Sequence, residues 1–501
     1  MRAVAEEKNM VEKLSYLVGY DTVKLHGKFR SYKPNPALGD NLTHFSLGDV
    51  PPDGESGASL VTFPRDTIMD GIEYPTYWSR LPLSIQANNR DQHKGLYSIH
   101  SLGTSLIFPL SQKDQDIQQE NDMRSCTAGV YIAFETDSPN ITLHFRYRNR
   151  PEVAKDGRHA LGGIQDKAFS GFDIYQMVKG VPEFRQNLRA PSGVMEGNLK
   201  FKTNLIPSIE EKGQFILVLP TYNGFEPDSK SECNPSGLTL EFDSQATTRT
   251  IELFDESLQE PIVIYGTSIT QGNGDNGLRP GATYPSQVMW ATKREVINLG
   301  FAGSAQLEYK MADFLSQISS SAFIIDPGWN LTSKSFEALE CTSNGKPANI
   351  TNGEIVNRVK YMVETYRANN PTTPIIICPK YLKYGDGECN GGKSSTPPKT
   401  IVMPNTFSNP HKYLYSREGF ILYKAYLELQ ESGIINIYFA DQKVPENASV
   451  DCDRWLGHNL QPANLHPPLE GMTSIANFIL ETLKIAVPEI YPIGKFSIPF
   501  V

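Results

Sequence analysis

The stretch "PIVIYGTSITQG", residues 261–272, decides the fold of the second half of this 501-residue chain. It begins with a run of apolar and β-branched residues, the pattern of a strand buried on both faces, and the run stops at Gly266. Ser268 follows two positions later, and Gly272 closes the turn. The stretch therefore predicts a buried strand that ends in a tight turn exposing one hydroxyl group.

Strand and helix patterns alternate from residue 249 to the end of the chain. Further apolar strand patterns are "EVINLG", "AFIIDP", "PIIICPK" and "INIYFAD", and amphipathic helix patterns such as "GEIVNRVKYMVETYRAN" and "LEGMTSIANFILETLKI" separate or follow them. This alternation predicts an α/β domain over 249–501 with a parallel sheet, in which ligands bind at the carboxyl ends of the strands. Residues 384–413, rich in Gly, Pro, Ser and Asn, are expected to form a long loop inserted into it.

The first half of the chain has a different sequence pattern. Short segments with alternating or β-branched and aromatic residues are separated by turn residues: "AGVYIAFETD", "NITLHFRYR", "GFDIYQMVKG", "GQFILVLPTY" and "LTLEFD". They predict an antiparallel β-sandwich over residues 77–248. Residues 1–76 are weakly patterned and rich in Pro and Gly, and we expect them to form an extended arm.

Composition excludes several classes of partner. The net charge of −9 leaves no basic surplus to bind the phosphates of a nucleic acid, and it disfavours an anionic membrane surface. No apolar run approaches the roughly 20 residues that cross a bilayer. The start, "MRAVAEEKNMVEKL", lacks the apolar core of a signal peptide, so we expect a cytoplasmic protein, or a secreted one from which a leader was removed.

The six cysteines form no CxxC pair and no histidines cluster near them, so no metal site and no cofactor are expected. Four of them lie in polar stretches: Cys233, Cys341, Cys389 and Cys452. Disulfides in an oxidising compartment and free thiols in the cytosol both fit this pattern.

The ends of the predicted strands carry residues suited to acyl transfer. Ser268 follows the first strand, "NLGFAGS" with Gly303 ends the second, "DPGWNLT" with Asn330 ends the third, and His466 precedes the last helix. A serine on such a turn is an exposed nucleophile, and a histidine can take its proton. The backbone N–H groups of Ser268 and Gly303 and the amide of Asn330 predict an oxyanion hole. Each residue alone is common in turns, and the combination carries the hypothesis.

These blocks resemble the SGNH/GDSL hydrolases, whose four namesake residues fall here on Ser268, Gly303, Asn330 and His466. The blocks "GTSITQG", "RPGATYPS", "INLGFAGSAQLE" and "HPPLEGM" are similar to the branch with an N-terminal domain named for a Gly-x-Asp-Leu-Tyr motif, which reads "GFDIY" at 171–175. The resemblance, which extends over about residues 77–485, implies a flavodoxin-like three-layer hydrolase domain after a β-sandwich. It also implies esterase activity, with acyl groups on carbohydrates or other small alcohols as a substrate class.

The sequence departs from this family at the position three residues before the histidine, where most members have an aspartate and this chain has Ala463. A backbone carbonyl or Asn464 could orient His466 instead, or an acid could come from Asp451 or Asp453. A third alternative is that hydrolysis is weak or lost, and the domain binds an acylated or carbohydrate ligand. The retained Ser, Gly, Asn and His favour a serine esterase, or a transacylase, over this alternative.

Two further residues are candidates for substrate binding. Arg279, in "GLRPG", could bind a polar or anionic group of the substrate or form a salt bridge. Trp329 could stack on a sugar or pack against neighbours. Asp173 of "GFDIY" is expected to stabilise a turn between the domains and to have no part in the chemistry.

Overall fold

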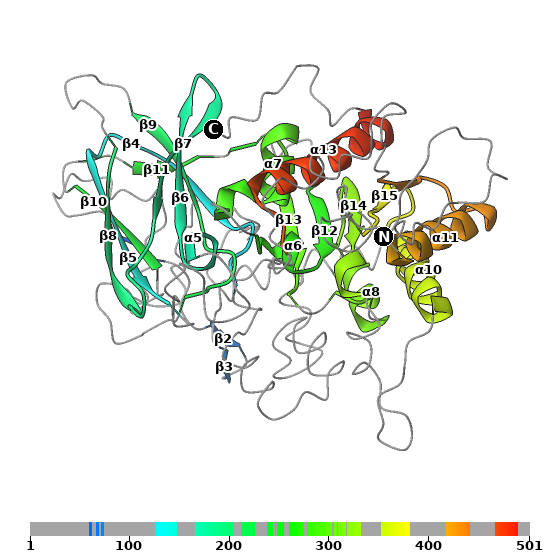
Figure 1. Ribbon diagram of the computed structural model, residues 1–501. Helices are drawn as coiled ribbons and strands as arrows, with labels where there is room; N and C mark the ends of the chain where they lie inside the picture. Colours follow the sequence, from blue (N-terminus) through cyan, green and yellow to red (C-terminus); the bar gives the residue numbers. More distant parts are fainter. Residues whose placement is uncertain are drawn as a thin grey trace, which may run out of the picture. The chain divides into compact units, whose positions relative to one another are not determined.

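The computed structural model describes most of the two predicted domains (Figure 1). The described residues are 60–62, 67–69, 72–74, 126–147, 166–203, 212–225, 238–243, 246, 248–251, 253–254, 260–274, 278–302, 305–307, 309–316, 318–331, 352–380, 417–440 and 466–488. Those up to residue 254 belong to one compact unit and those from 260 to another. The arm at 1–76, apart from three short strands, and the insertion at 384–413 lie outside the described residues.

The first unit is built from two antiparallel sheets. One has the strand order β1-β10-β5-β8 and the other the order β11-β4-β9-β6-β7, while β2 and β3 pair separately. Their bounds are β1 (Leu60–Thr62), β2 (Thr67–Met69), β3 (Ile72–Tyr74), β4 (Tyr131–Thr136), β5 (Asn140–Arg146), β6 (Phe172–Val178), β7 (Val181–Leu188), β8 (Glu196–Lys202), β9 (Gly213–Val218), β10 (Leu238–Phe242) and β11 (Thr248–Thr250), with a short helix α5 (Asp166–Phe169) before β6.

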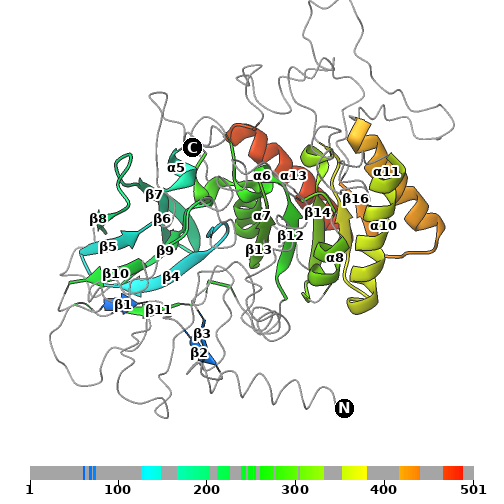
Figure 2. The same ribbon diagram turned by 90° about the horizontal axis from the view of Figure 1, so that it is seen from below.

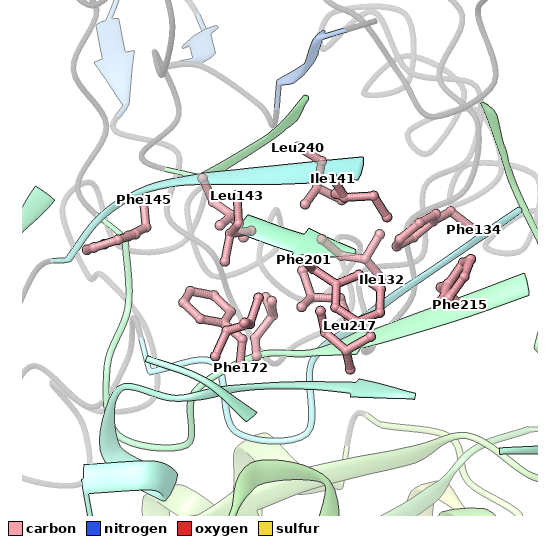
Figure 3. Packing of buried hydrophobic residues seen from close by; sticks show 14 of the residues in the cluster. Ile132, Phe134, Ile141, Leu143, Phe145, Phe172, Phe201, Phe215, Leu217 and Leu240 are labelled. Atoms are coloured by element: carbon pink, nitrogen blue, oxygen red, sulfur yellow. The ribbon is translucent and has the colours of Figure 1, made fainter. Parts of the chain in front are cut away.

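The two sheets enclose one apolar core. In β5, buried Ile141, Leu143 and Phe145 alternate with less buried polar residues, as expected for a strand with one face inward. Phe134 of β4 stacks on Phe215 of β9 at 5.9 Å and meets Phe242 of the opposite sheet edge-on at 5.6 Å. Figure 3 shows Ile141, Leu143 and Phe145 of one sheet converging with Phe134 and Phe215 of the other. The predicted antiparallel sandwich is therefore confirmed.

Among the described strands of the two sheets, four were not predicted, β1, β7, β8 and β11, and each lies at the edge of its sheet. β7 carries charged and polar side chains that are largely exposed, a common property of edge strands. Lys179 and Gly180, with φ of 52° and 77°, form the tight turn from β6 to β7. Asp173 lies within β6 and accepts a hydrogen bond from Asn187 of β7 at 2.8 Å, so the expected turn between domains was wrong.

The second unit contains a five-stranded, fully parallel sheet in the order β13-β12-β14-β15-β16. Its strands are β12 (Ile262–Gly266), β13 (Val296–Gly300), β14 (Ala322–Asp326), β15 (Ile375–Ile377) and β16 (Ile437–Phe439). In chain order this is the 2-1-3-4-5 arrangement of flavodoxin-like folds, whose ligands bind where the order reverses, between β12 and β14. The predicted α/β, flavodoxin-like class is confirmed.

Helices cover both faces of this sheet (Figures 1 and 2). α7 packs with α13 on one face, and α10 packs with α8 and α11 on the other. The bounds are α6 (Ser268–Gln271), α7 (Tyr284–Thr292), α8 (Tyr309–Leu315), α10 (Asn352–Asn369), α11 (Arg417–Glu431) and α13 (Leu469–Ala486). Among the described helices, none combines the length and the apolar character needed to cross a membrane.

Candidate active site

Ser268 is the first residue of α6, directly after β12. Two glycines allow this short helix to lie against the strand ends. A Cβ on Gly266 would fall 2.0 Å from Thr270 Oγ1, and a Cβ on Gly300 would fall 2.0 Å from the backbone nitrogen of Gln271. Any side chain at either position would push α6 away from the sheet, so these glycines determine where the serine lies.

His466 reaches the same place from the other end of the domain. Its Nε2 lies 2.9 Å from Ser268 Oγ, within hydrogen-bond distance, although the residues are 198 positions apart. Pro467 and Pro468 follow, and α13 begins at Leu469. The Pro467 carbonyl lies only 2.6 Å from where a Cβ on Gly274 would be, so the histidine segment packs closely on the loop after α6. Both side chains of the pair are half-buried and remain accessible to a small ligand.

Asn330 ends the neighbouring loop, in the short 3-10 helix η4 (Gly328–Asn330) after β14. Because β12 and β14 are adjacent parallel strands, the loops that carry Ser268 and Asn330 leave the same edge of the sheet. The Asn330 carbonyl accepts a hydrogen bond from Gln306 Nε2 at 3.3 Å, and its backbone N–H donates to the Pro327 carbonyl at 3.1 Å. Asn330 is half-buried, like the Ser268–His466 pair.

Gly303 lies outside the described residues, but the loop that leads to it is held in place. Ala302 N–H donates to Gln271 Oε1 at 2.9 Å, which links this loop to α6. Asn298 Nδ2 donates to the Thr270 carbonyl at 2.8 Å and its Oδ1 accepts from Gly300 N–H at 2.9 Å. The role of Gly303 stays a prediction.

A buried polar cluster lies beneath α6. The hydroxyl of Tyr284 donates to Asp326 Oδ2 at 2.8 Å, Thr270 Oγ1 donates to the same oxygen at 3.2 Å, and the two hydroxyls are 2.8 Å apart. Burial raises the pKa of Asp326 from 3.8 to about 6, although the two hydrogen bonds act to lower it. Burial, and after it the nearby Asp326 carboxylate, raises the pKa of Tyr284 well above its ordinary value.

Sequence reasoning missed this cluster and the two glutamines, Gln271 and Gln306. All five side chains are fully buried, so each polar group needs a partner that the sequence does not identify. The available signal was local: "SITQ" places two polar residues just after the serine, and Asp326 ends an otherwise apolar strand.

The remaining candidates have mixed outcomes. Arg279 is half-buried, directly before the 3-10 helix η3 (Pro280–Ala282), and its carbonyl accepts the Ala282 N–H at 3.0 Å. Trp329 is half-buried beside Asn330, and the Lys380 ammonium lies 5.3 Å from the centre of its ring. Lys380 also forms an ion pair with Glu418 at 3.4 Å. Because this lysine lies over the Trp329 ring, Trp329 has a packing role in addition to any role in binding.

Asp451, Asp453 and Ala463 lie outside the described residues, so the orientation of His466 by an acid stays a prediction. Within the part of the chain that the structure describes, no three His, Cys, Asp or Glu side chains are grouped as metal ligands. The side chains of Cys126 and Cys378 are buried, and the other four cysteines lie outside the described residues.

A serine and a histidine in hydrogen-bond contact at the carboxyl edge of a doubly wound sheet are typical of a serine hydrolase. Comparison with known families agrees: residues 259–387 match the GDSL-like Lipase/Acylhydrolase family. The second unit therefore carries a carboxylic ester hydrolase domain of the SGNH/GDSL type. The match begins just before β12 and includes Ser268 and Asn330.

The chain is also similar to solved structures, of which the first supports the fold assignment. A GDSL-like lipase from Bacteroides ovatus is 22% identical, with a TM-score of 0.50, and the alignment covers 76% of this chain and 89% of the lipase. The salicylyl-acyltransferase of a tetracycline biosynthetic pathway is 15% identical, with a TM-score of 0.48 and coverage of 77% and 91%. An acetyl xylan esterase from Butyrivibrio proteoclasticus is 12% identical, with a TM-score of 0.40 and coverage of 72% and 91%. None of the curated proteins matches the sequence.

Proposed function

We propose that the protein is a serine esterase that removes small acyl groups, such as acetyl, from a carbohydrate or another small alcohol. The observation that carries this proposal is the 2.9 Å contact between Ser268 Oγ and His466 Nε2. It supports a catalytic pair because serine is a weak nucleophile until an adjacent base takes its proton.

The reaction begins when Ser268 Oγ attacks the carbonyl carbon of the ester and passes its proton to His466 Nε2. The tetrahedral intermediate collapses as the imidazolium returns that proton to the leaving alcohol oxygen, and an acyl-serine remains. Water then attacks the acyl carbon, gives a proton to His466, and releases the carboxylic acid as the proton returns to Ser268. Atoms and charge balance with water as the only co-reactant.

The negative charge of the tetrahedral intermediate needs donors. We assign them to the backbone N–H of Ser268, the backbone N–H of Gly303 and the side-chain amide of Asn330. The loops of Ser268 and Asn330 leave adjacent strands. The loop after β13 is held to both of them, because Ala302 N–H donates to Gln271 of α6 and Gln306 donates to the Asn330 carbonyl. Donors held in advance stabilise developing charge without reorganising during the reaction.

Arg279 and Trp329 are proposed to contact the alcohol part of the substrate. Trp329 is adjacent to Asn330 and half-buried, so part of its side chain is exposed to solvent. A stacking surface of this kind suits a sugar ring, and Arg279 suits a polar or anionic substituent.

The test is replacement of Ser268 by Ala. It should abolish labelling by a fluorophosphonate probe and hydrolysis of nitrophenyl acetate. Ser432→Ala is the matched control, because this exposed serine follows α11 and its hydroxyl only donates to the Leu429 carbonyl. Wild-type turnover in the Ser268 variant would exclude it as the nucleophile.

Ala463, where most of the family have an aspartate, favours a second candidate: a domain of reduced activity that binds an acylated ligand. Calorimetry with an acetylated oligosaccharide distinguishes the two. An esterase releases acetate and turns over, whereas a binding domain gives saturable heat with no acetate. Transfer of the acyl group to an added alcohol in place of water would indicate a transacylase.

A further inference from the structure

Three buried side-chain oxygens form a triangle beneath the serine turn: Asp326 Oδ2, Tyr284 Oη and Thr270 Oγ1. Its edges measure 2.8, 2.8 and 3.2 Å, and all three side chains are fully buried. Asp326 Oδ1 is also buried and has no hydrogen-bond partner among the described residues. The proposed reaction uses none of these groups.

The triangle joins the two loops whose spacing matters most. Thr270 lies two residues after Ser268 on α6, and Asp326 ends β14, four residues before Asn330. Thr270 is held on its backbone as well, since its carbonyl accepts from Asn298 Nδ2 at 2.8 Å. The turn carrying the nucleophile is therefore fixed from two sides, and one side connects it to the strand that carries the proposed oxyanion donor.

A buried carboxyl group is a costly hydrogen-bond partner for a buried tyrosine, because removing it from water is unfavourable. The same domain contains a buried tyrosine with uncharged partners. Tyr366, equally buried, donates to the Ile318 carbonyl at 2.8 Å and contacts Ser320 Oγ at 2.7 Å, and neither partner carries a charge. That arrangement lies just before β14, at the amino end of the sheet and away from Ser268. Uncharged partners of this kind could satisfy Tyr284 as well. Because burying a carboxyl group costs free energy, stability alone does not explain why Asp326 is the partner of Tyr284.

We propose that Asp326, Tyr284 and Thr270 are positioning residues that hold α6 against β14 and so set Ser268 Oγ relative to His466 and Asn330. This inference rests on the proposed function of Ser268. The three side chains act through the backbone of α6 and touch no substrate. Their loss should slow the acylation step and leave substrate binding almost unchanged.

The experiment compares four variants with the wild type on nitrophenyl acetate and with the fluorophosphonate probe. Tyr284→Phe and Thr270→Val each remove one hydroxyl, and each should lower kcat about 10- to 100-fold with little change in KM, because small displacements of reacting groups have such effects. Thr270→Ser restores the hydroxyl and should recover most of the rate. Tyr366→Phe makes the same deletion away from the site and should keep the wild-type kcat.

Crystal structures of the same variants separate this inference from the proposed function. The Ser268 Oγ–His466 Nε2 distance should lengthen beyond hydrogen-bond range in Tyr284→Phe and Thr270→Val but not in Tyr366→Phe. An unchanged distance, or equal loss of activity in Tyr284→Phe and Tyr366→Phe, overturns the positioning role. A wild-type protein that neither reacts with the probe nor hydrolyses the ester overturns the proposed function, and the distances still decide the positioning role.

Discussion

Replacing Asp326 by Asn should change how the stability of the hydrolase domain depends on pH. Asparagine has almost the same shape as aspartate and keeps a carbonyl oxygen for the hydroxyls of Tyr284 and Thr270. Its amide nitrogen would occupy the place of Oδ1, which has no partner in the described structure, so the variant carries a constant cost of an unsatisfied donor. What it removes is the titration of the buried carboxyl group.

The magnitude follows from the pKa. Burial raises the pKa of Asp326 from 3.8 to about 6, which corresponds to about 3 kcal/mol of unfolding free energy between its two protonation states. The native state binds the proton more tightly than the unfolded chain, so the wild type loses stability as pH rises from about 4 to about 6. Below this window the penalty is absent, and above it the penalty is complete. In the Asn variant this contribution is constant.

Urea unfolding at half-unit steps from pH 3.5 to 7.5 measures the effect, with tryptophan fluorescence as the signal. Trp290, buried in α7, and Trp329 report on the hydrolase domain. The quantity of interest is the wild-type minus variant difference, in which the other carboxyl groups cancel. It should fall by about 3 kcal/mol over this whole pH range, with about 2 kcal/mol of the change between pH 4 and 6. Tyr366→Phe should show a constant difference, and a flat or rising difference for Asp326→Asn would refute the reasoning.

Three further outcomes are expected. Asn330→Ala should lower kcat by about 100-fold or more in esterase assays while the circular dichroism spectrum is retained, because it removes a donor to transition-state charge; an effect confined to KM would argue against that role. Gly300→Ala should lower both the melting temperature and the rate of probe labelling, since its Cβ would fall 2.0 Å from the Gln271 nitrogen. Gly433→Ala is the control: its Cβ would meet no atom within 4 Å, and despite the φ of 87° at this position the variant should retain the labelling rate. Ala463→Asp should keep or raise activity if His466 works without an acid; if Asp451 or Asp453 already serves, neutralising that residue should cost about 10⁴-fold in kcat, as loss of a triad acid can.

Much of the fold can be predicted from local pattern. The apolar runs at β12, β13, β14, β15 and β16 read as buried strands because a parallel sheet covered on both faces needs apolar residues on both sides of each strand. The edge strands of the sandwich lack this signature. β7 and β8 have polar, exposed residues because one of their sides meets solvent, and their pairing depends on neighbours far along the chain.

That Ser268 and His466 lie close together can be predicted for a different reason. Each residue sits in a loop at the carboxyl edge of the sheet, and parallel topology brings all such loops to one place. The partners of buried polar groups cannot be found in this way. Thr270 and Tyr284 have no periodic signature, and only the three-dimensional structure shows that their hydroxyls meet one carboxyl oxygen.

Sheet topology and side-chain contacts determine different features of the site. Topology brings Ser268, Asn330 and His466 to the same edge, but it allows displacements of an ångström or more, which are large for a reacting pair. The finer spacing comes from contacts that tolerate little change: Gly266 and Gly300 beneath α6, and the Asp326 carboxyl group that binds the hydroxyls of Thr270 and Tyr284. A chain that kept the serine and histidine but lost these contacts would retain the fold and the motif while losing the 2.9 Å contact on which the proposed esterase activity depends.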